Sequence, residues 1–288
     1  MSPPRGPPSA IDFFDMAAPK YEWASGSSTR EVGQLVLQLP QLQDLQGPAA
    51  VVLDNACGTA VVAEEIIAQC KRTGAPLPQI HAVDPAKKML AIAQDKIAAL
   101  GAQAGCKLAV MPAEKLDFPD ATFTHSITNL GILFFADAPA AAKEIYRTLK
   151  PGGVAVVTSW SDMGYVKGVI QPAQKAARPD DKPFNLPIPP EWFSADHVKA
   201  VLEDGGFAQV QLVRKPAHFG APALPELRDM LLEAFIHLWS RTWSEDEQVK
   251  FKEAVLEHLA KVTVPYTTPS GEPGVGVPME AIIAVCRK

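Results

Sequence analysis

From residue 50 onward, the chain alternates apolar runs of strand length with longer amphipathic runs of helix length. We predict strands at 50–54, 79–84, 106–110, 123–129, 154–160, 208–215 and 279–286. The segments between them carry apolar residues at helical spacing. This alternation is typical of parallel strands joined by crossover helices, so we predict an α/β fold with a doubly wound, mostly parallel sheet.

The same pattern divides the chain into three regions. Residues 1–49 hold a proline-rich lead, which we expect to be disordered, and a helical arm. Residues 50–215 together with 279–288 form the predicted core. Residues 216–278 form a predicted helical lid, inserted before the last strand and rich in aromatic side chains. Within the core, Asp137 and Ser194 stand where N-caps of two helices are expected.

Composition excludes several classes of protein. Lys and Arg number 27 against 32 Asp and Glu, which leaves a formal net charge of -5 and gives no basic field for nucleic acid. No apolar stretch is long enough to span a membrane, and the N-terminus lacks the apolar segment of a secretory signal. The four cysteines contain no CxxC pair, so neither a disulfide framework nor a metal site is expected. We therefore expect a cytoplasmic protein with a small-molecule partner.

Candidate chemistry begins where the first predicted strand ends, in the turn 54–60 of small residues. This turn has a single glycine, Gly58, and therefore matches neither the three-glycine dinucleotide fingerprint nor a phosphate-binding P-loop. Asp84, at the end of the second strand, can bind both hydroxyls of a ribose. Asp54 would repel a pyrophosphate but suits a ligand with an amino group and a positive charge. This combination favours S-adenosylmethionine over NAD.

Four segments in order then carry a family resemblance. They are Leu53-Asp54-Asn55-Ala56-Cys57-Gly58-Thr59-Ala60, Val83-Asp84, Met111-Pro112-Ala113-Glu114-Lys115-Leu116-Asp117-Phe118-Pro119 and Leu149-Lys150-Pro151-Gly152-Gly153. With them the chain resembles the class I S-adenosylmethionine-dependent methyltransferases, and in its first motif the small-molecule methyltransferases of fungal secondary metabolism, including thiol-methylating ones. The resemblance implies a Rossmann-like fold, S-adenosylmethionine as cofactor and S-adenosylhomocysteine as product.

Two positions depart from the family pattern. Ala56 and Ala60 replace the outer glycines of the first motif, which removes the freedom of glycine to adopt positive φ. Pro112 replaces the acidic residue that usually holds the adenine amine, so we assign the adenine edge to the Ala113 backbone and to Glu114.

The predicted site residues lie at the ends of strands, in the arm and in the lid. The cofactor residues are Tyr21, Asp54, Ala56, Gly58, Asp84, Pro85, Met89, Ala113, Glu114 and Asn129. Aromatic residues predicted to wall the acceptor pocket are Trp23, Trp160, Trp192, Phe235 and Trp239. His237 is the single candidate for a general base.

A sulfonium already activates its methyl group, so orientation supplies much of the rate and no base is required for a thiolate or a free amine. A hydroxyl acceptor usually needs proton removal. We therefore expect a sulfur or nitrogen acceptor in preference to oxygen. Two alternatives stay open: a cofactor-binding regulatory protein without turnover, suggested by the two alanines, and a methyltransferase-like fold recruited for a cyclisation or rearrangement.

Overall fold

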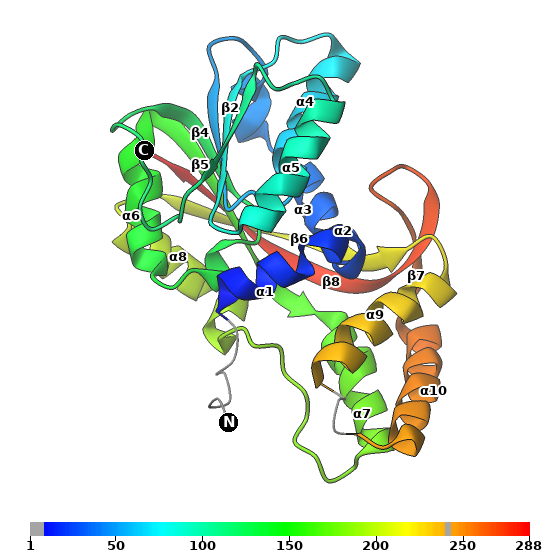
Figure 1. Cartoon of the computed structure of the whole chain (residues 1–288). Helices are drawn as coiled ribbons and strands as arrows, with labels where there is room; N and C mark the ends of the chain where they lie inside the picture. The colour runs from blue at the N-terminus through cyan, green and yellow to red at the C-terminus, as the bar shows by residue number, and fades with distance from the viewer. Residues whose placement is uncertain (1–8, 240–242) are drawn as a thin grey trace, which may run out of the picture.

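The computed structural model describes residues 9–239 and 243–288, without the side chains of 234–239, and is built around one mixed sheet (Figure 1). The strand order is β3-β2-β1-β4-β5-β8-β6, with β7 paired to β8. Strands β1 to β5 are parallel, and β8 runs antiparallel to both β5 and β6. The strands are β1 (Val51–Asn55), β2 (Gln79–Asp84), β3 (Cys106–Val110), β4 (Phe123–Thr128), β5 (Leu149–Met163), β6 (Val210–Ala221), β7 (Val264–Thr267) and β8 (Pro273–Arg287). The predicted fold class is confirmed.

Helices cover both faces of the sheet because successive strand residues point to opposite sides. In β1, Val52 packs into the apolar cluster beneath α4 (Val61–Thr73) and α5 (Lys87–Ala99). The next residue, Leu53, belongs to the cluster beneath α6 (Ala138–Thr148) and α8 (Ala195–Asp204). Both residues are fully buried, so β1 is the centre of a two-sided core.

Local signals fix where these helices begin. The Asp137 carboxylate accepts the Ala140 N–H at 2.9 Å, as expected of an N-cap. Ser194 does precede α8, but its side chain makes no capping bond, so the predicted cap is a backbone position only. A capping box at Ser244 starts α10 (Glu245–Val262).

The segment predicted as a helical lid, 216–278, is only partly helical. β6 continues to Ala221 and β8 begins at Pro273, so both ends of that segment are strand. The helices between them are α9 (Leu224–Trp239) and α10. Helix α10 packs against α9 and also against the π-helical Val166–Ile170 and α7 (Gln171–Ala177), two segments that come between β5 and α8 in the chain. Pro172 stands in the first turn of α7, where proline is tolerated. Over the described residues, no helix combines the length and apolarity needed to cross a membrane.

The N-terminal arm consists of α1 (Ala10–Ala17), α2 (Tyr21–Ala24) and α3 (Ser28–Leu37). Figure 1 shows α1 and α2 lying across the middle of the molecule, between the sheet and the lid helices. This position puts the arm over the carboxyl ends of the parallel strands, where α/β folds bind their ligands.

Candidate functional site

A cavity of about 530 Å³ lies at the carboxyl ends of β1, β2 and β4. The arm closes it from outside with Ser9, Ala10, Ile11 and Phe14. Nearly all of the predicted cofactor residues meet here: Tyr21, Ala56, Gly58, Asp84, Pro85, Met89, Ala113, Glu114 and Asn129 line the cavity. Asp54 is the one predicted cofactor residue that does not.

Asp84 holds the first loop in place. Its two carboxylate oxygens accept the Gly58 N–H at 2.9 Å and the Ala86 N–H at 2.8 Å. Burial raises the pKa of this carboxyl, and the two N–H groups partly offset that rise. A Cβ built on Gly58 would meet no atom within 4 Å, so the space above this residue is free for a ligand. The end of β2 and the loop after β1 therefore present a carboxylate and bare backbone to the cavity.

The two alanines of the loop correct a sequence-based expectation. Ala56 has φ 53° and Ala60 has φ 62°, so both adopt the left-handed conformation despite carrying a Cβ. The loop thus keeps the path that glycines would allow. The reason is that the surrounding contacts, including the Asp84 bond to Gly58, fix the backbone and outweigh the strain.

Asp54 has a different place from the one predicted. Its side chain is 1% exposed and accepts the Ala63 N–H at 3.0 Å, beneath the loop and at the first turn of α4. Burial raises the pKa of this carboxyl to about 7, and the nearby Asp84 charge adds to the rise. Asp54 therefore supports the loop from below, whereas the sequence predicted direct contact with the amino group of the cofactor.

Two other predicted residues bridge protein segments. Asn129 donates from Nδ2 to the Thr29 carbonyl and accepts the Thr158 hydroxyl at Oδ1, both at 2.9 Å. The Glu114 carboxylate accepts the Ala136 N–H at 2.9 Å. Because both polar atoms of the Asn129 amide have protein partners, its backbone is the part best placed to meet a ligand.

The titratable groups of the cavity give it a negative character. Among the residues that line it, Asp84, Glu114 and Asp137 are acidic, and none is Lys, Arg, His or Cys. Such a cavity suits a cationic ligand and disfavours a pyrophosphate. Burial and the Asp84 charge raise the pKa of Tyr21 to about 12, so its hydroxyl keeps its proton. These features fit S-adenosylmethionine, whose sulfonium and amino group are positive.

Comparison with known proteins agrees with this geometry. Residues 52–153 match the family model described as a methyltransferase domain. The chain therefore carries a methyltransferase domain, and the residues around the cavity fit S-adenosylmethionine as its cofactor.

Individual relatives extend the similarity to different lengths. The acetylaranotin bis-thiomethyltransferase of Aspergillus terreus is 25% identical over 93% of this chain and 94% of its own. The ubiquinone/menaquinone biosynthesis C-methyltransferase of Geotalea daltonii is 29% identical over 54% of this chain, and the match spans 64% of that relative. Among solved structures, the 4+2 cyclase SpnF superposes with a TM-score of 0.58 at 17% identity, covering 98% of this chain and 97% of its own, and shares the fold.

The aromatic residues predicted to wall an acceptor pocket in this methyltransferase need correction. Trp160 and Trp192 are 6% and 7% exposed and lie in the apolar core, where the Trp192 ring meets the edge of His197. Trp23 packs against the same core. The predicted residues Phe235, His237 and Trp239 lie on α9, but their side chains are outside the described residues.

Sequence reasoning missed the aromatic rim of the cofactor cavity. Phe134 and Phe135, after β4, line it, and the Phe14 ring of α1 meets Phe134 edge-on at 4.9 Å. The pair Phe13-Phe14 in an amphipathic arm was the available signal. A second cavity of about 570 Å³ lies beyond β5, with Met163, Leu186 and Phe193 among its walls, and shares no lining residue with the first. In the described residues, no group of three His, Cys, Asp or Glu side chains is placed to hold a metal ion.

Proposed function

We propose that this methyltransferase transfers the methyl group of S-adenosylmethionine to a sulfur or nitrogen atom of a small apolar or aromatic metabolite. The observation that carries the proposal is that, among the described residues lining the cavity, none is His, Lys or Cys and each carboxylate already accepts a backbone N–H. The carboxylates are engaged: Asp84 with two backbone N–H groups, Glu114 with Ala136, and Asp137 with Ala140. The Tyr21 hydroxyl is held protonated. An acceptor that arrives as a thiolate or free amine needs no proton removed, whereas a hydroxyl does.

Orientation then supplies the rate. The sulfonium of bound S-adenosylmethionine supplies the reactive methyl group. The chain holds the two reactants close together in a fixed orientation, and well-oriented reactants reach effective molarities of about 10⁵ to 10⁸ M. The apolar rim of Ile11, Phe14, Phe134 and Phe135 excludes water and favours an apolar or flat acceptor. A thiomethyltransferase among the relatives supports sulfur as acceptor.

The cofactor part of the proposal is tested by calorimetry with S-adenosylmethionine, S-adenosylhomocysteine and NAD. We expect the first two to bind and NAD not to bind. Asp84→Asn is preferable to Asp84→Ala because it keeps one acceptor for the two backbone donors. It should weaken binding about 10- to 100-fold, the effect of losing a charge-assisted contact worth about 1.5–3 kcal/mol. Asp117→Asn changes an exposed carboxylate that does not line the cavity; it is the matched control and should bind as wild type.

The acceptor part is tested with deuterated S-adenosylmethionine and a panel of aromatic thiols, amines and phenols, with products weighed by mass spectrometry. We expect thiols and amines to gain the label and phenols to react far more slowly. Turnover of phenols alone would contradict the proposal. A changed substrate of unchanged mass would favour the rearrangement alternative, and cofactor binding with no product from any acceptor would favour the regulatory one.

A further inference from the structure

The outer wall of the cofactor cavity is held by few contacts. Helix α1 has no buried residue, and the Met16 side chain is 61% exposed. Its contacts with the rest of the protein include the Asp15 carboxylate, which accepts the Lys88 N–H at 2.8 Å, the edge contact of Phe14 with Phe134, and the packing of Phe14 against the cluster of Ala18, Ala86 and Met89. A segment with so little buried surface opens at low energetic cost.

Helix α3, only a few residues further on, is fixed on three sides. The Thr29 carbonyl accepts the Asn129 amide at the end of β4. Glu31 accepts the His218 backbone N–H and contacts its ring Nδ1 at 2.7 and 2.9 Å. Arg30 turns to α4. The arm therefore has a firmly anchored second half, α3, and a first half, residues 9–24, whose packing comes from Phe14, Ala18, Tyr21 and Trp23.

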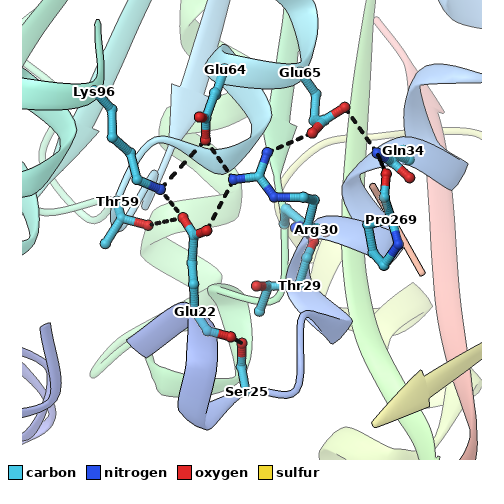
Figure 2. Close-up of polar contacts among 11 residues, drawn as sticks. Glu22, Ser25, Thr29, Arg30, Gln34, Thr59, Glu64, Glu65, Lys96 and Pro269 are labelled. Carbon is cyan, nitrogen blue, oxygen red and sulfur yellow. Dashed lines mark hydrogen bonds and ion pairs between the residues drawn. The ribbon is translucent and has the colours of Figure 1, made fainter. Parts of the chain in front are cut away.

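Glu22 joins these two halves to the cofactor loop, as Figure 2 shows. Its carboxylate accepts the Thr59 hydroxyl at 2.9 Å and the Arg30 guanidinium at 3.0 Å, and it pairs with the Lys96 ammonium of α5. Its neighbour Tyr21 lines the cavity, and so does Gly58, the neighbour of Thr59. One side chain thus ties the arm wall of the cavity to the loop wall.

The contacts of Glu22 can be removed without breaking the other ion pairs around Arg30. Arg30 also pairs with Glu64 and Glu65 at 2.5 Å, so it stays anchored to α4 without Glu22. Side chains of the cluster are 16–29% exposed, and such partly buried pairs are less screened by salt than surface pairs. Loss of Glu22 therefore weakens the attachment of α2, which keeps the packing of Trp23, while leaving α3 in place.

We propose that Glu22 is a positioning residue that holds the arm closed over the cofactor cavity and slows release of the bound S-adenosyl ligand. It acts through Tyr21 and Thr59 and makes no contact with the ligand itself. The proposal rests on the proposed function, because it takes the cavity to be the cofactor site.

The test compares Glu22→Gln with Glu65→Gln, a matched control that contacts Arg30 and Gln34 but not α2. Dissociation of radiolabelled S-adenosylhomocysteine is followed after a chase of unlabelled ligand. We expect Glu22→Gln to release the ligand about tenfold faster, with a smaller change in association rate, and Glu65→Gln to stay within about twofold of wild type. Equal release rates for Glu22→Gln and wild type, or equal acceleration by both variants, would overturn the proposal.

Hydrogen exchange of the ligand-free proteins gives a second readout. In Glu22→Gln, amide exchange should be faster over residues 10–25 and unchanged over residues 28–37. A general loss of stability would accelerate exchange in both segments. If Glu22→Gln does not fold, Thr59→Val removes only the hydroxyl contact and should speed exchange in the same segment. If wild type binds no S-adenosylhomocysteine, the proposed function fails. In that case, unchanged exchange over 10–25 in the variant would overturn the role of Glu22 as well.

Discussion

Replacing the strained alanines by glycine should separate backbone strain from packing at the cofactor loop. Ala56 and Ala60 both have φ in the left-handed region, at 53° and 62°. This conformation costs an L-residue about 1–2 kcal/mol, because Cβ approaches the following carbonyl oxygen. Glycine adopts it without that cost, so each substitution releases a similar amount of strain.

The two positions differ in what their methyl groups contact. Ala60 is 0% exposed, so Ala60→Gly loses a buried methyl worth about 0.8 kcal/mol. Ala56 is half-buried and lines the cavity, so Ala56→Gly loses much less. Both substitutions also raise the entropy of the unfolded chain, which costs about 0.4–1 kcal/mol. We therefore expect Ala56→Gly to stabilise the protein by about 0.5–1 kcal/mol and Ala60→Gly to change its stability little.

Urea unfolding followed by circular dichroism measures both variants against wild type. The slope with denaturant should not change, so a shift in midpoint reports the free energy of unfolding directly. A larger gain for Ala60→Gly than for Ala56→Gly, or a loss for Ala56→Gly, would refute the balance of strain and burial. Calorimetry on the same variants then shows whether the alanines weaken cofactor binding, as the regulatory alternative requires.

Two further predictions concern stability. The pKa of Asp54 rises from 3.8 in the unfolded chain to about 7 in the fold, so its contribution to stability is present below pH 4 and is lost as pH rises to about 7. Asp54→Asn should remove this pH-dependent loss, which is at most about 4 kcal/mol. Identical pH profiles of melting temperature for the variant and wild type would refute this prediction. A Cβ on Gly220 would come within 2.1 Å of the Tyr266 hydroxyl, so Gly220→Ala should destabilise the protein by about 1–3 kcal/mol, as measured by urea unfolding. The loss should be much smaller in a Tyr266→Leu background, where the hydroxyl is absent. Equal losses in both backgrounds would rule out this clash.

Sequence pattern located the core strands well because they are buried on both faces. Strands β2 and β3 have the predicted limits, and β8 is the apolar run closing the chain. The pattern failed where pairing depends on distant partners. β6 and β8 extend beyond their apolar segments, since each supplies the other with backbone partners from Ala221↔Val275 onward. Strand β7 was missed for the same reason: it pairs with the first part of β8.

At the candidate site, motif positions were predictable and side-chain direction was not. The position of Asp84 at the end of β2 placed it on the cavity. Asp54 is the penultimate residue of β1, but its side chain turns under the loop to the first turn of α4. The alternation of a strand ends at its last residue, so it cannot predict which way the following loop folds. The tryptophans show the same limit, because an apolar side chain can serve a core or a pocket equally well.

Three consecutive residues of the arm contact helix α9, the cofactor cavity and the loop after β1. Lys20 pairs with Glu233 on the lid helix α9, Tyr21 lines the cofactor cavity, and Glu22 holds the loop through Thr59. Because these residues are consecutive, we expect an opening of the cavity at Tyr21 to strain the contact between Lys20 and α9 as well. The Lys20 pair is partly exposed and contributes about 1 kcal/mol or less. Of these two ionic side chains, we therefore expect Glu22 to contribute more than Lys20 to holding the arm in place.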